Sequence, residues 1–492
     1  MSGVATKDAA IRGAAAGGPA AGGPAASGAA ASGAAARLAA FPALAARLPG
    51  ADLPWLAALR RRAIERFADA GWPTGRLDAW RHTSLAALET QRFAPAANAR
   101  PEALLKRLRR DGAVDGHRLV FVDGEFAPSL SAIGPLPAGV GIGALSDVLR
   151  TRTPRLEALN LEALNLEAPH LEAPNLEALH FEALYGSADD GEAPAALNAA
   201  LASDGAVIRL ARGVLVDAPI HLVFIGGVRR GESHVRNLVS AAAGARAVIV
   251  EHHVGDDDAA ALTTTVTRID AGADARITHL KLQQEPPQAV HLATVDAVQA
   301  RGAAFASHSL ALGARLARVD LHTRLDGEGC DALLNGLYLV DGRRHVDHHT
   351  RIEHAQPRGT SHEHYRGIVD DVGHGVFCGR IVVAPGAART DALQRTDSLL
   401  LSPQAQADAR PELEIYADDV KCAHGATVGQ IDEESLFYLR SRGLDLAHAR
   451  DLLIWAFAAE VLMRIDVPSL RAYAEAAVRA RLPGGALPET SR

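Results

Sequence analysis

Apolar and polar residues alternate along much of the chain between Gly205 and Leu401. Because alternate residues of a strand face opposite sides of a sheet, each alternating stretch predicts a β-strand. These stretches begin at glycines that recur every 27 to 30 residues, at Gly244, Gly272, Gly302, Gly329, Gly359 and Gly386. Short strands and turns that repeat at a regular interval, with no helical pattern between them, are typical of a β-solenoid. The region therefore predicts a parallel β-helix; the alternative is an antiparallel sandwich whose glycine spacing is accidental.

Different patterns precede this region. From Leu56 to Phe67, apolar residues fall on one helical face, Pro54 suits the first helical position, and Gly71 can end the helix. The segment LVFVDGEF then predicts a β-hairpin whose turn is Asp123–Gly124.

Helical patterns return after Val428. Asp432 can cap a helix that Gly443 ends, and a second helix is expected from about Leu446 to Ile465. This second helix is apolar on more than one side, which predicts burial within its own domain or docking of a partner. The candidate docking residues are Leu452, Leu453, Trp455, Phe457, Val461 and Leu462.

Two segments have repetitive sequences and little to bury. Residues 1–36 are rich in Ala and Gly, which predicts a disordered tail. Between Leu156 and Tyr185 a five-residue unit recurs, and we favour a flexible or locally helical insertion over a stacked coil because Pro169 and Pro174 would break a helix. The expected organisation is a tail at 1–36, an N-terminal helical domain with a small hairpin at 37–150, a repeat insertion at 151–190, the β-helix at 191–428 and a C-terminal helical domain at 429–492.

Composition narrows the function. Of the 492 residues, 48% are hydrophobic but only 4% are aromatic, so thin regular layers of small and aliphatic residues suit the chain. A formal net charge of -7 without a basic run argues against nucleic acid as a partner. The sequence has neither a signal-peptide pattern nor an apolar stretch of the ~20 residues that span a bilayer, so we expect a cytoplasmic protein without membrane contact.

The cysteines and two segments of the chain bear on metal chemistry. Cys330, Cys378 and Cys422 are too few for a disulfide framework or a self-contained cluster site. Seven histidines lie close together, at His345, His348, His349, His354, His362, His364 and His374, and they suggest either a metal site or, as we favour, solvent-facing side chains on coil edges. In YADDVKCAHGATVGQ, Cys422 and His424 would share one strand face and could bind a metal, although a polar turn at the end of the β-helix explains the segment equally well.

Several enzyme signatures are missing. The sequence has no G-x-x-x-x-G-K-[ST] phosphate loop, no G-x-S-x-G elbow and no H-E-x-x-H motif. Gly139, Gly141 and Gly143 have the wrong spacing for a dinucleotide-binding fingerprint. No complete active site is evident.

The segment YADDVKCAHGATVGQIDEESLFYLRSRGL, Tyr416 to Leu444, closely resembles the SufB/SufD family of iron–sulfur cluster assembly proteins. Further matching segments are YRGI at Tyr365, VFCGRIVV at Val376, TDALQRTDSLLLSPQA at Thr390, ALNAAL at Ala196 and GWPTGRLDAWRHTSL at Gly71. The chain is similar to the SufD type of subunit. The SufB type has a HEA-type sequence in place of CAHGATVG, and it has a cysteine where this chain has Leu439.

The resemblance implies a mainly β fold, a right-handed parallel β-helix flanked by helical domains, and a scaffold subunit that is not an enzyme. It implies pairing with a SufB-like subunit, docking of a SufC-like ABC-type ATPase by the C-terminal helices, and a homodimer when the chain is isolated. No cofactor would be tightly bound by this chain alone; iron or a nascent cluster would be shared transiently with SufB. The family's histidine implicated in cluster assembly corresponds to His424, with Cys422 beside it.

Two other functions remain open on the residues alone. A stand-alone carbohydrate-active enzyme with a β-helix fold would need a row of acidic and basic residues along one face and normally a secretion signal. A SufB-like subunit would bind a cluster on its own.

Overall fold

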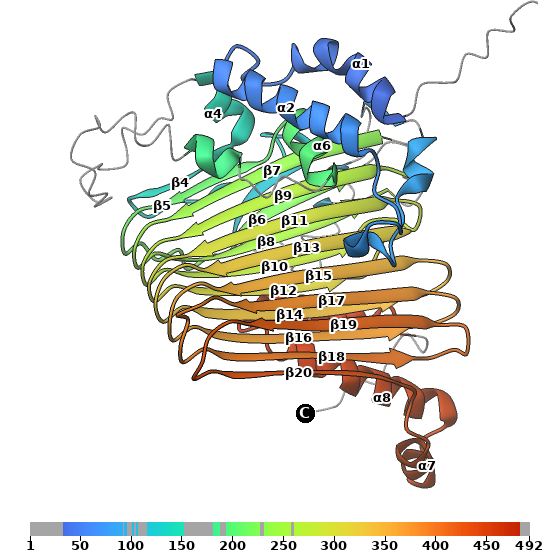
Figure 1. Ribbon diagram of the computed structural model, residues 1–492. Helices are drawn as coiled ribbons and strands as arrows, with labels where there is room; N and C mark the ends of the chain where they lie inside the picture. The colour runs from blue at the N-terminus through green and yellow to red at the C-terminus, as the bar shows by residue number, and fades with distance from the viewer. Residues whose placement is uncertain are drawn as a thin grey trace, which may run out of the picture.

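The computed structural model describes residues 33–91, 93–95, 101–102, 105–106, 116–151, 181–186, 193–226, 231–256 and 260–482. The described chain is mainly β, with two long sheets stacked face to face and helices near both ends (Figure 1). Most of the repeat insertion expected at 151–190, and all of the expected tail except Gly33–Ala36, lie outside the described residues. Those four residues begin a helix.

Successive strands alternate between two sheets. Sheet A consists, in spatial order, of β19 (Gln406–Ile415), β17 (His374–Val383), β15 (His345–His354), β13 (Leu316–Leu325), β11 (Val290–Gln299), β9 (Leu262–Ala271), β7 (Gly231–Ala241), β5 (Ala206–Leu210) and β4 (Val140–Ala144), with β1 (Ala94–Pro95) beside β7. Sheet B consists of β20 (Lys421–Gly429), β18 (Asp391–Leu400), β16 (Thr360–Val369), β14 (Asp331–Val340), β12 (Ala304–Ala311), β10 (Arg276–Gln284), β8 (Arg246–Gly255), β6 (Ile220–Gly226), β2 (His117–Val122) and β3 (Glu125–Phe126). The paired strands are parallel except β2–β3 and β4–β5. The predicted parallel β-helix is confirmed, and the sandwich alternative is wrong.

The recurring glycines lie at the turns that lead from sheet A to sheet B. Gly244 shows one reason for glycine there: its φ of 71° is in the left-handed region that side chains disfavour. Gly272 shows another, because a Cβ there would lie 2.8 Å from the carbonyl oxygen of Ala241 in the preceding coil. Where Gly272 does not supply the left-handed residue, Asp274 does, with φ of 59°. Successive turns therefore have the same left-handed backbone conformation, supplied by Gly244 in one coil and by Asp274 in the next.

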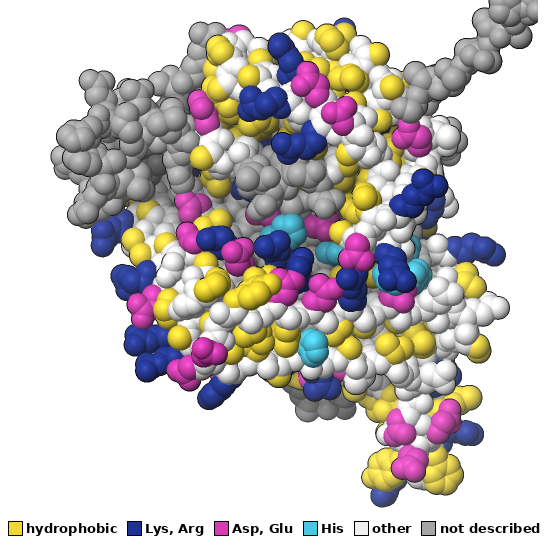
Figure 2. Space-filling view, in the orientation of Figure 1, with side chains coloured by type: hydrophobic (Ala, Val, Ile, Leu, Met, Phe, Trp, Pro, Cys, Tyr) yellow, Lys and Arg dark blue, Asp and Glu magenta, His cyan; other side chains and the backbone are white. Residues whose placement is uncertain are grey.

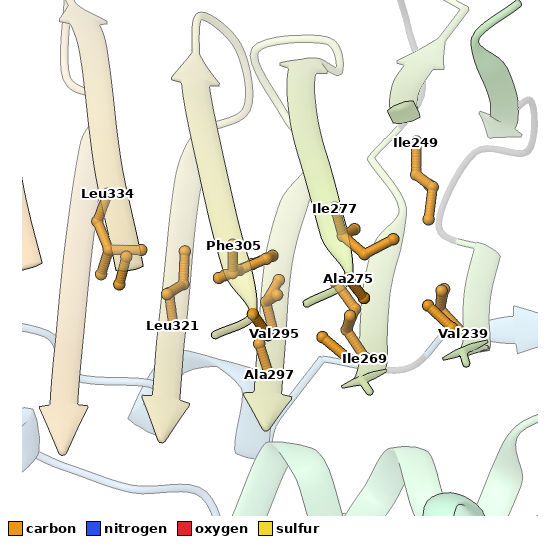
Figure 3. Close-up of a cluster of buried hydrophobic side chains, with 14 of the residues drawn as sticks. Val239, Ile249, Ile269, Ala275, Ile277, Val295, Ala297, Phe305, Leu321 and Leu334 are labelled. Atoms are coloured by element: carbon orange, nitrogen blue, oxygen red, sulfur yellow. The ribbon is translucent and has the colours of Figure 1, made fainter. Parts of the chain in front are cut away.

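The space between the sheets, which we call the lumen, is filled near these turns by aliphatic side chains. Figure 3 shows Ile249, Ile277 and Phe305 from sheet B facing Ile269 and Val295 from sheet A. Each coil adds a layer of inward-facing residues over the previous one, so the apolar core is continuous along the solenoid. Burial of these layers, rather than helix packing, holds the coils together.

Helices cover the outer face of sheet A near the first coils. They are α1 (Gly33–Ala45), α2 (Pro54–Ala70), the short 3-10 helix η2 (Ala86–Glu89), α4 (Leu145–Thr151) and α6 (Ala193–Leu201). A second 3-10 helix, η1 (Asp78–Trp80), lies farther along the sheet, beside Arg318 of β13. The expected helix from Pro54 is confirmed: Pro54 is at its first turn and Gly71 donates its N–H to Phe67. The expected hairpin is β2–β3, with left-handed Asp123 and Gly124 in its turn.

The segment ALNAAL lies in α6, all of whose residues are buried. Its one polar side chain, Asn198, donates to the carbonyls of Val235 and Thr264 at 2.9 and 3.1 Å and accepts from Arg236. A buried amide with all these partners ties the helix to strands β7 and β9.

The C-terminal helices α7 (Glu433–Ser441), α8 (Leu446–Leu462) and α9 (Pro468–Arg479) follow β20. Asp432 caps α7 as expected, accepting from the N–H of Ser435 at 3.0 Å. Helix α8 lies on the outer face of sheet B, where the side chain of Asn335 donates to the carbonyl of Val461 at 3.0 Å. None of the helices in the described part of the chain is long and apolar enough to cross a membrane.

Candidate functional site

Two rows of inward-facing side chains run along sheet B and end at its last strand, β20. One row is Ala247, Ile277, Phe305, Ala332, Ser361, Ala392 and finally Cys422. The neighbouring row is Ile249, His279, Ser307, Leu334, Glu363, Gln394 and finally His424. The structure therefore brings the two predicted site residues together on the lumen side of one strand, as their spacing indicated.

The surroundings of the two side chains differ. Cys422 is half-buried against the lumen core, whereas His424 is exposed. Burial and the charge of Asp391 raise the pKa of the Cys422 thiol. The thiol is therefore protonated in the isolated chain at neutral pH, and it would have to lose its proton to bind a metal.

A buried carboxyl group lies below His424 in the same row. Glu363 is 2% exposed and accepts a hydrogen bond from the Gln394 amide at 2.5 Å. Burial raises the pKa of Glu363 to about 7, so the group can hold or release a proton near neutral pH. Sequence reasoning missed Glu363 and Gln394, because their alignment with His424 depends on the register between coils.

The last coil has an open edge. In the described chain, β20 pairs only with β18, and β19 pairs only with β17 (Figure 1). Nearly all residues of β20 are exposed. The described residues contain no group of three or more His, Cys, Asp or Glu side chains that could hold a metal ion. Cys422 and His424 thus provide two donor side chains at an edge where another chain could supply the rest.

Three of the seven clustered histidines are buried, three are partly buried and His362 is exposed, so the solvent-facing arrangement that we favoured holds for one of them only. His348 and His354 are 1% and 0% exposed, and they pair with the Ser309 and Ser361 hydroxyls at 3.1 and 2.8 Å. Burial lowers the pKa of both to about 4, so both are neutral at physiological pH. They fill the lumen of the solenoid, and His364 is likewise buried, beneath α8.

A second hollow lies on the outer face of sheet A. This sheet A cavity has a volume of about 990 Å³, and Figure 2 shows basic, acidic and histidine side chains gathered across this face. Its charged and thiol lining is Asp78, Arg268, Asp270, Asp296, Arg318, Asp320, His322, Arg324, His349, Arg351, Glu353, Cys378, Arg380, Arg410 and Glu412. The sequence does not reveal it, because each strand contributes only a few outward-facing residues.

The segment Asp78–Thr83, which we call the strap, borders this cavity. Trp80 is buried and its ring lies 3.6 Å from the guanidinium of Arg318. The hydroxyl of Thr83 donates to Asp347 at 2.5 Å, and His82 pairs with Asp408 at 3.1 Å. The conspicuous GWPTGRLDAWRHTSL segment therefore fastens the N-terminal region to the late coils of sheet A.

The candidate docking residues on α8 do not form one exposed surface. Val461 and Leu462 are fully buried against sheet B, so neither is available to a partner in this structure, and that part of the expectation is corrected. Leu452, Leu453, Trp455 and Phe457 are partly buried. The exposed apolar side chains of this region are Phe437, Tyr438, Leu446 and Met463, at 75%, 56%, 48% and 60% exposure.

Comparisons with known proteins agree with the fold. The family model described as "SUF system FeS cluster assembly, SufBD core domain" matches residues 224–457. The "Iron-sulfur cluster assembly protein SufD" of Escherichia coli is 33% identical over 430 residues, which cover 86% of this chain and 92% of that protein. An iron–sulfur cluster assembly SufBD family protein of Synechocystis is 28% identical over 87% of this chain and 91% of its own length. The chloroplastic protein ABCI7 of Arabidopsis thaliana is 28% identical over 86% of this chain and 85% of its own length.

Proposed function

Because the chain belongs to the SufBD family of iron–sulfur cluster assembly proteins, we propose that it is a scaffold subunit that contributes Cys422 and His424 to a site completed by a partner. The single observation that carries this proposal is the position of the two side chains. They end two rows of lumen residues at the unpaired edge of the last coil.

A SufB-like subunit is the partner proposed at this edge. An exposed edge strand has free backbone N–H and C=O groups that can extend a sheet with a strand from another chain. A strand added beside β20 would place its own inward-facing side chains next to Cys422 and His424. Iron or a nascent cluster is then cargo held between two subunits.

The chain's own residues have distinct tasks in this proposal. The imidazole of His424 and the thiol of Cys422 suit iron, and the thiol must give up its proton as the metal arrives. The row beneath offers an acceptor for that proton, since Glu363 titrates near neutrality and lies next to Gln394 in the row that ends at His424. Glu363 would act through its neighbours without touching the metal.

A SufC-like ATPase is the partner proposed for the C-terminal helices. Phe437 and Tyr438 on α7 are large, exposed and next to each other, which is unusual for a surface without a partner. Nucleotide-driven closure of that partner could move α7 and α8, and α8 packs directly on sheet B. We propose that this motion changes the edge at β20 during cluster assembly in the cytoplasm, a reducing compartment in which three free cysteines are expected.

Co-expression tests the complex. We expect the chain to co-purify with SufB-like and SufC-like proteins from the same source on size-exclusion chromatography. Elution of the full chain alone, while the other two remain together, would contradict the proposal.

Substitution of His424 tests the site. His424→Ala should lower the rate of cluster assembly on the complex by at least about tenfold, as expected for loss of a ligand-type side chain, while the complex stays intact. The matched control is His362→Ala, because His362 is also an exposed strand histidine but its strand neighbours Ser361 and Glu363 face the lumen. Equal rates for the two variants would remove His424 from the mechanism.

A further inference from the structure

Cys378 opens into the sheet A cavity, on the outer face of sheet A, whereas the proposed cluster site is on the lumen side of β20. It lies on β17 and is partly exposed, whereas Cys330 is 1% exposed. Burial raises the pKa of both the Cys330 and the Cys422 thiols. Cys378 is distinguished from them by an ionised neighbour.

That neighbour is His349, the residue directly beside Cys378 in the next strand of the sheet. The Nε2 atom of His349 lies 3.1 Å from Asp347 and 3.2 Å from the Nη1 atom of Arg318. Burial would lower the pKa of His349, but the charge and hydrogen bond of Asp347 outweigh it and raise the pKa to about 10. The ring is therefore an imidazolium at neutral pH.

Asp347 is buried and has several polar contacts of its own. It is 0% exposed, lies 2.9 Å from the guanidinium of Arg318 and accepts from the Thr83 hydroxyl at 2.5 Å. Cysteine, histidine and aspartate thus lie next to one another at the wall of a cavity: Cys378 beside His349 in the sheet, and His349 in an ion pair with Asp347. An imidazolium beside a cysteine stabilises the thiolate, which is the nucleophilic form.

We propose that Cys378 is a reactive thiol that forms a mixed disulfide with small disulfides carrying carboxylate groups. The sulfur of Cys378 attacks one sulfur of the small disulfide, a new S–S bond forms, and the original S–S bond breaks. The departing thiolate takes the proton of the Cys378–His349 pair and leaves as a thiol. The small disulfide is the oxidant, and a second small thiol reverses the step.

The preference for carboxylates follows from the cations that surround the thiol. Arg410 interacts electrostatically with Cys378, and Arg380 lies two residues away on the same face of β17. Both guanidinium groups already pair with acids: Arg410 with Asp78 at 2.9 Å and with Glu412 at 2.6 Å, and Arg380 with Glu414. Of these acids, Asp78 is the most exposed, at 73%. A carboxylate of the reagent can replace such an exposed partner at little cost. This inference does not depend on the proposed role in cluster assembly.

Labelling of the full chain tests the inference. The protein is treated with limiting oxidised glutathione, and modification of each cysteine peptide is followed by mass spectrometry. Cys378 should react at least about tenfold faster than Cys422, and His349→Gln should remove most of that advantage. Cystamine, a cationic disulfide, should modify Cys378 of the wild-type protein at least about fivefold more slowly than oxidised glutathione does. Arg410→Gln should reduce the difference in Cys378 rate between the two reagents.

The comparison of the two reagents needs no variant, so a folding defect in His349→Gln does not remove the test. Equal labelling of Cys378 and Cys422 in the wild-type protein would overturn the inference. Faster reaction with cystamine than with oxidised glutathione would overturn the carboxylate preference. An unchanged Cys378 rate in a folded His349→Gln variant would show that the histidine does not activate the thiol.

Discussion

The two ends of the solenoid differ in whether their polar groups find partners within the chain. In the early coils, buried polar groups find their partners within the chain: Asp204 accepts from the backbone N–H groups of Phe126, Ser146 and Gly205. At the last coil, the described residues leave β20 with one strand neighbour, and His424, on the lumen side of that strand, is exposed. The polar groups of the early coils are thus paired within the chain, whereas the described last coil ends in an open edge.

Acidic side chains show the same contrast. Glu251 in β8 is 0% exposed and is surrounded by His253, His279 and Lys281, at 3.2, 3.2 and 3.0 Å. Glu412 in β19 pairs with Arg410 at 2.6 Å, but its side chain is 34% exposed. A buried charge depends on its partners, whereas an exposed one is solvated without them.

The largest effect is expected from removing the buried charge. Glu251→Ala leaves the Lys281 ammonium buried without its carboxylate and should lower the free energy of unfolding by about 3–5 kcal/mol. Glu412→Ala, the matched change at the open end, should lower it by less than about 1 kcal/mol. Denaturant unfolding of both variants measures the difference, and similar losses would mean that the two ends are not distinct.

A smaller effect on the free energy of unfolding is expected from pH. The contributions of Glu285 and Glu363 change in opposite directions as pH rises. In the early coils, burial would raise the pKa of Glu285, but the charge of His291 and other contacts outweigh it and lower the pKa to about 2. Its stabilising contribution is therefore present above its ordinary pKa of 4.5 and is lost as pH falls towards 2. At the open end, burial raises the pKa of Glu363 from 4.5 to about 7, so its contribution is present below pH 4.5 and is lost as pH rises through 7.

Two amide substitutions separate these effects. Glu285→Gln should destabilise the chain at about pH 8 and do so less at about pH 3, because below pH 4.5 the wild-type unfolded chain binds a proton at Glu285 that the folded chain does not. Glu363→Gln should be nearly neutral at about pH 4 and should stabilise the chain at about pH 8, by up to about 3 kcal/mol. Thermal unfolding at these pH values is the measurement, and a destabilising Glu363→Gln at about pH 8 would contradict the assignment.

The sequence predicted the repeating parts of the fold better than the contacts between them. Glycines at the turns and alternation in the strands are local signals, and they gave the β-helix, the hairpin and the position of Cys422 and His424 on one face. The alignment of Glu363 and Gln394 with His424 was out of reach, because it depends on the register of residues about one coil apart. The strap was missed for the same reason, since Thr83 and Asp347 are 264 positions apart.

The histidines and α8 show a different difficulty. His348 was expected to face solvent at a coil edge, yet it is buried in the lumen, where its Nε2 atom pairs with the Ser309 hydroxyl of the other sheet. Val461 was expected to dock a partner because α8 is apolar on several sides, yet sheet B covers it. Composition shows that an apolar side chain must be buried and that a buried polar one needs a hydrogen-bond partner. Only the fold shows which part of the chain buries the first or supplies the partner of the second.

The smallest effect is expected at β20 itself. The hydroxyl of Thr427 donates to Asp397 in β18 at 2.5 Å, and this bond helps to hold a strand that has a neighbour on one side only. Thr427→Val keeps the shape but removes the donor, which should cost about 1 kcal/mol. Because an edge strand can open without the rest of the fold, the loss should speed amide hydrogen exchange in β20 while global unfolding hardly changes. Thr427→Ser keeps the hydroxyl and is the control. Equal exchange in the two variants would show that strand pairing alone positions His424, and slower exchange on adding a SufB-like partner would show that the open edge is where that partner binds.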